Sequence, residues 1–260
     1  ARASFFTMAD IAQSVGGLSG SGTINKVAKF TATDTVGDGL ITDDGTSVNN
    51  TGAGGITTNT AFGVGSLISN TTGEPNTAIG NSALYSNTTG SYNTANGNNA
   101  LYNNTTGNRN IANGSYALYS NTAGSDNTAN GYRSLYNNTT GINNTASGYQ
   151  SLYYNTTGGS NVALGAYSLL NNTTGFRNIA SGTKSLFNNT TGFRNVVSGY
   201  ESMFNNISGS DNVGSGYQVF LSNTTGSENV GIGVQALSSN TTGSSNTAIG
   251  RSSNSGNFSG

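Results

Sequence analysis

The chain contains no histidine and no cysteine, and only 7% of its 260 residues are charged. The absence of histidine removes the usual general base, the commonest metal ligand and every histidine-containing triad. The absence of cysteine excludes a disulfide framework and a thiolate metal site, and it leaves the redox compartment open. We therefore expect a protein that is not an enzyme and that carries no cofactor and no metal.

Charge and hydropathy also exclude two kinds of partner. The net charge is −1 and the nine basic residues are scattered, so no patch for nucleic acid or anionic lipid is expected. No apolar run approaches the roughly 20 residues of a membrane helix, and the N-terminus lacks a signal-peptide pattern. The sequence predicts a chain that is soluble as written, without membrane insertion.

A repeat of 17 residues, without insertion or deletion, organises most of the sequence. With 39 Gly, one Pro and 33% hydrophobic residues, the composition alone would suggest low-complexity disorder. Strict register over 12 copies argues instead for one coil of chain per repeat. A Gly follows four residues after each recurring Asn, and that Asn occupies Asn59, Asn76, Asn93, Asn110, Asn127, Asn144, Asn161, Asn178, Asn195, Asn212, Asn229 and Asn246.

The repeat predicts an all-β fold, a parallel β-solenoid (β-roll) of about twelve coils. Short segments between Gly and Asn corners, where positive φ is allowed, are expected to be strands. Stacking at about 4.8 Å gives a rod roughly 55 to 60 Å long. One row of core residues is expected at Leu67, Leu84, Leu101, Leu118, Leu135, Leu152, Leu169, Leu186, Met203, Phe220 and Leu237, beside a row of Tyr, Phe and Leu.

Identical residues should lie above one another, so Asn side chains can hydrogen-bond from coil to coil and Tyr rings can stack. About four apolar residues per coil is thin for a monomer, because each contributes about 1.5 to 3 kcal/mol against about 1 to 2 kcal/mol of backbone entropy per fixed residue. We therefore expect a homotrimer that pools this apolar surface and covers the solenoid edges.

The sequence before the array divides into two parts. Residues 1–20 hold the only stretch with helical spacing and are interpreted as an N-terminal connector. Residues 21–52 predict a small β capping element, with strands around Val27–Thr31 and Leu40–Thr42 and turns at Asp34–Gly39 and Asp43–Gly45. The solenoid takes residues 53–260.

Three chemical alternatives have weak support. Asp211 and Glu228 share one repeat position, and the separation expected for neighbouring coils suits a polysaccharide-cleaving pair, but that position is otherwise variable. Ice-binding arrays present Thr on a flat strand, whereas Thr-Thr here precedes Gly. The sequon Asn-Thr-Thr is better explained as a corner, and it recurs at Asn70, Asn87, Asn104, Asn138, Asn155, Asn172, Asn189, Asn223 and Asn240.

Surface aromatic residues form the best ligand hypothesis. Aromatic faces and guanidinium groups stack on or hydrogen-bond to sugars, and these side chains recur at two repeat positions. Packing against a neighbouring chain or loop is the competing explanation for each of them. The candidate glycan-contacting residues are Tyr132, Tyr149, Phe176, Arg177, Phe193, Arg194, Tyr200 and Tyr217.

Two resemblances point to a fibre. The Asn-Thr-Ala-Ile-Gly at Asn76–Gly80 and Asn246–Gly250 resembles the signature of trimeric autotransporter adhesin heads, whose coils are three residues shorter. The segments Gly20–Thr31 and Gly37–Thr46 resemble phage tail fibres and related bacterial fibre proteins, which often end in an intramolecular chaperone that does not follow Gly260. The missing chaperone suggests self-cleavage or a fragment.

These resemblances imply a structural and adhesive fibre segment. We expect a phage tail fibre in the virion, attached to the tail or baseplate through its N-terminus and binding a host-surface glycan or protein receptor. The alternative is a trimeric adhesin on a bacterial cell surface or in the extracellular space. Ice binding and polysaccharide cleavage are remote alternatives.

Overall fold

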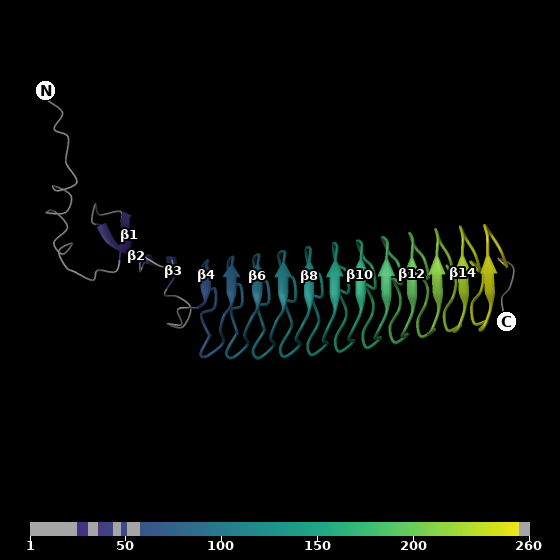
Figure 1. Cartoon of the computed structure of the whole chain (residues 1–260), viewed down its shortest axis with the longest axis horizontal. Coiled ribbons are helices and arrows are strands. Elements are labelled where there is room, and N and C mark those ends of the chain that lie inside the picture. Colours follow the sequence, from purple (N-terminus) through teal and green to yellow (C-terminus); the bar gives the residue numbers. More distant parts are fainter. Residues whose placement is uncertain (1–24, 31–35, 44–47, 51–57, 255–260) are drawn as a thin grey trace, which may run out of the picture.

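The computed structural model describes residues 25–30, 36–43, 48–50 and 58–254, and most of the described chain is one solenoid (Figure 1). Twelve strands of three residues form a single parallel sheet in strict chain order. They bound about eleven coils of 17 residues, so the predicted parallel β-solenoid is confirmed. The strands are β4 (Thr60–Phe62), β5 (Thr77–Ile79), β6 (Thr94–Asn96), β7 (Ile111–Asn113), β8 (Thr128–Asn130), β9 (Thr145–Ser147), β10 (Val162–Leu164), β11 (Ile179–Ser181), β12 (Val196–Ser198), β13 (Val213–Ser215), β14 (Val230–Ile232) and β15 (Thr247–Ile249).

The strands pair in register, with each residue opposite its repeat equivalent. Val162 pairs with Ile179 and Ala163 pairs with Ala180, and the same pattern holds from β4 to β15. A one-residue slip would turn every strand side chain to the opposite face. This explains why the repeat length never changes along the array.

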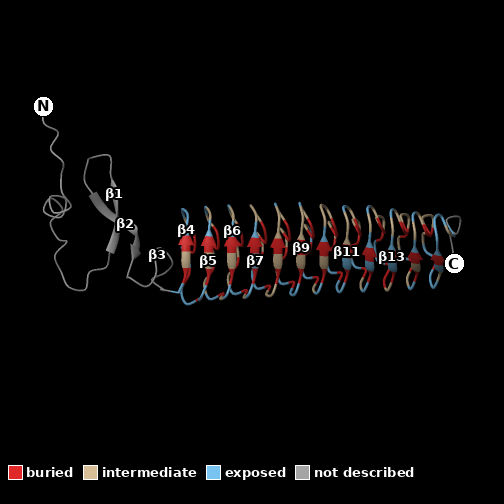
Figure 2. Ribbon diagram, turned by 45° about the horizontal axis from the view of Figure 1, so that its top comes forward, coloured by how far each residue is buried: buried red, intermediate tan, exposed pale blue. Residues whose placement is uncertain are grey.

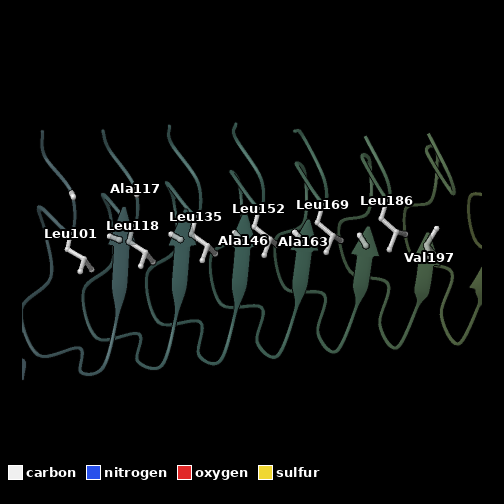
Figure 3. Packing of buried hydrophobic residues seen from close by; sticks show 14 of the residues in the cluster. Leu101, Ala117, Leu118, Leu135, Ala146, Leu152, Ala163, Leu169, Leu186 and Val197 are labelled. Carbon is white, nitrogen blue, oxygen red and sulfur yellow. The ribbon is translucent and has the colours of Figure 1, made fainter. Parts of the chain in front are cut away.

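The core consists of two apolar rows inside the coils (Figure 3). The middle residue of each strand points inward and is mostly Ala, as in Ala146 and Ala163, and the Leu row packs beside it. All members of the Leu row, including Met203 and Phe220, are fully buried. The predicted Leu row is therefore confirmed as a continuous core.

Around Phe220 the strand row contains smaller residues than elsewhere. Phe220 replaces Leu, and Gly214 and Gly231 replace the usual strand Ala. A methyl group added at Gly231 would lie 2.8 Å from the Phe220 ring. The two glycines therefore provide the room that the ring needs.

The core is complete within one chain, which changes the reasoning about assembly (Figure 2). Leu, Ala and two Asn of each coil are buried without any contribution from another chain. Trimer formation stays a prediction, and the interior that each chain builds is partly polar. Hydrogen bonds between coils satisfy most of the ladder amides, whereas the buried hydroxyls of Ser185 and Ser202 have no partner among the described residues.

Two ladders of buried asparagines line the interior. In the first, the recurring Asn110 accepts a hydrogen bond at Oδ1 from the Asn127 backbone N–H (3.1 Å), and its own Nδ2 donates to the Gly124 carbonyl (2.8 Å). In the second, which contains the sequon residues, Asn138 donates to Asn121 Oδ1 (2.8 Å) and to the Gly141 carbonyl (3.0 Å). The predicted amide ladders are confirmed, and they satisfy groups that would be costly to bury alone.

The backbone conformation corrects one prediction about the corners. The first Gly row has positive φ, for example 135° at Gly131, as expected. The Asn of both ladders do not have positive φ. The left-handed residues are instead the core Leu (51° at Leu118) and two partly exposed positions, represented by Tyr116 and Asp126. Burying a Leu contributes about 1.5–3 kcal/mol, which outweighs the roughly 1–2 kcal/mol cost of a left-handed residue.

Tyrosine rings stack from coil to coil, as predicted, but this row is half-buried beside the core and is not part of it, as the core expectation had it. Tyr85 and Tyr102 have ring centroids 4.9 Å apart with an interplanar angle of 4°. The stack continues through Tyr119, Tyr136 and Tyr153, and Phe187 stacks on Phe204 further along. Offset stacks of this kind add to the stability that the burial of the rings provides.

Before the solenoid, three strands form an antiparallel sheet, namely β1 (Asn25–Phe30), β2 (Val36–Asp43) and β3 (Val48–Asn50). The predicted small β element is therefore present within 21–52. The predicted turn at Asp34–Gly39 is wrong for Val36 to Gly39, which belong to the paired strand β2. The expected connector at 1–20 lies outside the described residues.

Candidate functional site

The solenoid turns every repeat position into a row of side chains, one per coil. The candidate residues fall on three such rows. Phe176 and Phe193, each followed by Arg, come just before strands β11 and β12, whereas the four Tyr follow the Gly at the end of a strand. The strand separates the Tyr row from the Phe and Arg rows, so the structure groups the aromatic candidates as three stacked pairs and not as one patch.

The first pair combines aromatic and cationic groups. The rings of Phe176 and Phe193 are 5.0 Å apart and nearly parallel at 4°. The Arg194 guanidinium carbon lies 4.7 Å from the Phe193 ring centroid, and that of Arg177 lies 5.9 Å from Phe176. Phe176 is 40% exposed although it is a large apolar residue, so this pair is accessible to a ligand.

The two tyrosine pairs are similarly accessible. The ring centroids of Tyr132 and Tyr149 are 5.6 Å apart, and those of Tyr200 and Tyr217 are also 5.6 Å apart. Arg133 lies 5.0 Å from the centroid of Tyr132, which adds a cation–π contact. A hydrogen bond with Glu201 raises the pKa of Tyr200, so this phenol stays protonated at neutral pH.

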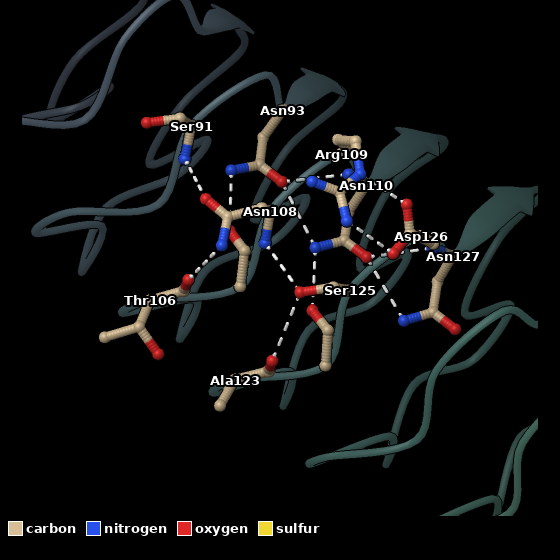
Figure 4. A network of polar contacts seen from close by, with 12 residues as sticks. Ser91, Asn93, Thr106, Asn108, Arg109, Asn110, Ala123, Ser125, Asp126 and Asn127 are labelled. Atoms are coloured by element: carbon tan, nitrogen blue, oxygen red, sulfur yellow. Dashed lines mark hydrogen bonds and ion pairs between the residues drawn. The ribbon is translucent and has the colours of Figure 1, made fainter.

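Arg194 is not free to hold an anionic ligand, because it is paired with Asp211 on the next coil. Its Nε and Nη2 donate to the two carboxylate oxygens of Asp211 at 2.5 and 2.8 Å. Arg109 and Asp126 form the same bidentate pair at 2.6 and 2.9 Å (Figure 4). The members of each pair are 17 residues apart, so they occupy the same repeat position on neighbouring coils.

The ion pair with Arg194 also determines the protonation state of Asp211, which was considered with Glu228 as a pair for polysaccharide cleavage. The hydrogen bonds from Arg194 lower the pKa of Asp211, so it is a carboxylate at neutral pH. Glu228 accepts a hydrogen bond from the Ser245 hydroxyl at 3.1 Å. Glycoside cleavage needs one protonated acid with a raised pKa. Asp211 lacks that property.

The sequon asparagines form the second buried ladder and are not surface sites. Asn138, Asn155 and Asn172 have no exposed surface, and both polar atoms of each amide are used between coils. The threonine after each Asn also works structurally, since Thr139 Oγ1 donates to the Thr156 carbonyl at 3.1 Å. The interpretation of Asn-Thr-Thr as a structural corner agrees with this arrangement.

A groove that sequence reasoning missed runs along the rod over seven coils. It has a volume of about 1090 Å³, and two rows form most of its wall: the residue before each sequon Asn and the residue after it. In the sequence both rows flank the ladder Asn. That both point to the same side of the rod follows only from the shape of the coil in cross-section. The lining residues are Ser120, Asn137, Thr139, Tyr154, Thr156, Asn171, Thr173, Asn188, Thr190, Asn205, Ile207, Ser222 and Thr224.

Neither a metal-binding cluster nor a membrane-spanning helix is present in the described part of the chain. In 25–30, 36–43, 48–50 and 58–254, no cluster of three or more acidic side chains suited to a metal ion occurs. The same stretches contain no helix with the length and hydropathy needed to cross a bilayer.

Comparison with known proteins adds no assignment. No family model, no curated protein and no solved structure matches the chain.

Proposed function

We propose that the chain is a structural and adhesive fibre segment that binds a host surface through side-chain rows on a stiff solenoid. The observation that carries the proposal is the in-register array of twelve strands, which places the two rings of each exposed aromatic pair one coil apart, at about 4.8 Å along the rod. A surface with this repeat suits multivalent contact with a repetitive ligand such as a glycan. No reaction is assigned to it.

Attachment to a phage tail in the virion is the more specific part of the proposal. Its support is the resemblance of Gly20–Thr31 and Gly37–Thr46 to tail-fibre segments. The cell-surface adhesin remains the alternative on the resemblance of the strand motif, and the genes beside this one would separate the two.

We also propose that copies of this chain associate through a row of exposed apolar side chains on the outer face of the sheet. The first residue of β10 to β14 is Val or Ile, and Ile179, Val196 and Val213 are 43%, 44% and 43% exposed. The same position holds Thr in β5, β6, β8 and β9. A continuous row of apolar side chains on an outer sheet face favours contact with a second sheet.

The adhesive proposal is tested by binding of the labelled full chain to bacterial cells and to a glycan array. The double variant Phe176→Ser/Phe193→Ser should weaken binding at least tenfold. It should fold, because Ser occupies the same row at Ser210 and Ser227. The matched control Ile142→Ser, in that row but not aromatic, should bind like the unmodified chain. Failure of the full chain to bind any cell or glycan would refute the adhesive function.

A further inference from the structure

We infer that the groove over seven coils binds a neutral, linear glycan laid parallel to the rod. This inference rests on the proposed adhesive function and names its ligand class, at a site separate from the aromatic pairs.

The lining is uncharged from end to end. It consists of Ser, Thr and Asn with one Tyr and one Ile, whereas every described charged side chain lies outside it. An anionic glycan or nucleic acid would lose hydration here without gaining a cation. The absence of charge therefore selects a neutral ligand.

The asparagine row offers unused hydrogen-bonding capacity. Asn137 and Asn205 each donate one amide N–H to a main-chain carbonyl at 3.0 Å, and Asn171 donates one to Asn188 Oδ1 at 3.0 Å. An amide has two N–H groups and an acceptor oxygen, so each residue keeps a donor for a ligand beyond the partners found among the described residues. Hydroxyl groups, which both donate and accept, match this row.

The threonine row supplies the complementary wall. Thr139, Thr156 and Thr173 each use the hydroxyl hydrogen on the carbonyl of the next coil, at 3.1, 3.1 and 3.0 Å. Toward a ligand they therefore present methyl groups and an oxygen acceptor. Tyr154 is 48% exposed and is fixed by an edge contact with Tyr153 at 4.6 Å. Its ring can stack on the apolar face of a sugar.

The spacing distinguishes a glycan from other extended chains. The rows repeat at the coil spacing of about 4.8 Å, close to the length of one pyranose ring in an extended chain, whereas a peptide strand advances about 3.3 Å per residue. A lipid tail would leave the Asn amides without partners, at a cost of about 1–3 kcal/mol each. A neutral sugar chain fits both the repeat and the polarity.

The test uses the full chain and three neutral probes, the β-1,4-linked hexasaccharides of glucose, mannose and xylose, with hexagalacturonate as an anionic probe. Calorimetry should detect binding of at least one neutral hexasaccharide, weaker binding of its trimer, and no binding of hexagalacturonate. The variant Asn171→Ser/Asn188→Ser/Asn205→Ser should weaken binding at least tenfold. Ser occupies this row at Ser120 and Ser222, so the variant should fold.

The matched control is Asn113→Ser/Asn130→Ser, which changes the same residue type on the outer face of the sheet, where Ser147 and Ser181 hold the equivalent position. It should bind like the unmodified chain. The inference is overturned if no neutral probe binds, if the groove variant binds equally well, or if groove substitutions change the mass in solution because a second copy fills the groove. Unchanged cell binding by the groove variant would contradict the groove alone and leave the adhesive function standing.

Discussion

Replacing one buried ladder asparagine should destabilise the solenoid far more than replacing an exposed asparagine. Asn138→Leu keeps the side-chain size but removes three hydrogen bonds, those to Asn121 Oδ1 and the Gly141 carbonyl and the one received from Asn155 Nδ2. Asn121 Oδ1 and one amide hydrogen of Asn155 are left buried without this partner, at about 1–3 kcal/mol each, whereas the Gly141 carbonyl still accepts a hydrogen bond from Asn127 Nδ2. The expected loss in the free energy of unfolding is therefore about 2–6 kcal/mol.

Chemical denaturation followed by circular dichroism measures this loss, and native-state hydrogen exchange shows where it falls. Coils in a repeat protein contact mainly their neighbours, so exchange should accelerate most around Asn121 to Asn155. The control Asn143→Ser lies at an exposed position where Ser160 has the same left-handed backbone, and it should stay within about 0.5 kcal/mol of the unmodified chain. An Asn138→Leu protein as stable as this control would refute the idea that amide ladders hold the core.

Four further outcomes are expected. Gly231→Ala should cost about 1–3 kcal/mol by overpacking against Phe220 and Val219, and Phe220→Leu should reduce that cost in part; a denaturation cycle without coupling between positions 231 and 220 would contradict this packing. Leu135→Ala should cost about 2–5 kcal/mol in the same assay, whereas an unchanged midpoint would place Leu135 outside the core. Because Arg109 lowers the pKa of Asp126, the pair stabilises the fold above the unfolded Asp pKa of about 3.9, and this contribution is lost as the pH falls through the lower folded pKa. Thermal melts of Asp126→Asn should therefore show a smaller loss of stability below about pH 4 than the unmodified chain, and identical pH profiles would exclude the pair as a contributor. Sedimentation should give about three times the 26.3 kDa chain mass, and Val196→Thr/Val213→Thr should lower it; a mass of 26.3 kDa for the unmodified chain would contradict trimer formation.

Much of the fold could be predicted because the repeat carries it. The constant 17-residue spacing determines which residues align, so the Leu row, the stacked tyrosines and both amide ladders follow from counting. The side on which each residue points could not be obtained in this way. The left-handed conformation of Leu118 and the full burial of Asn138 depend on the coil cross-section, which no local pattern encodes.

The candidate site shows the same limit. Phe176 and Phe193 were expected to contact sugars, and the structure adds that their rings stack on each other because one coil separates them. The repeat positions of the Phe and Tyr residues could be read from the sequence, but not that a strand lies between the two rows. Sequence reasoning also undervalued Asn137 and Thr139, whose rows form the groove wall only when the buried Asn138 turns both of them outward.

The central claim is that each 17-residue repeat forms one coil stacked in register on the last. Deletion of residues 127–143 removes one repeat, whereas deletion of residues 127–142 removes one residue fewer and breaks the register. Hydrogen exchange on the two proteins is the most direct measurement. The account predicts that the 17-residue deletion keeps the protection of the full array on both sides of the junction, and that the 16-residue deletion loses protection there. Equal protection in the two proteins would contradict it.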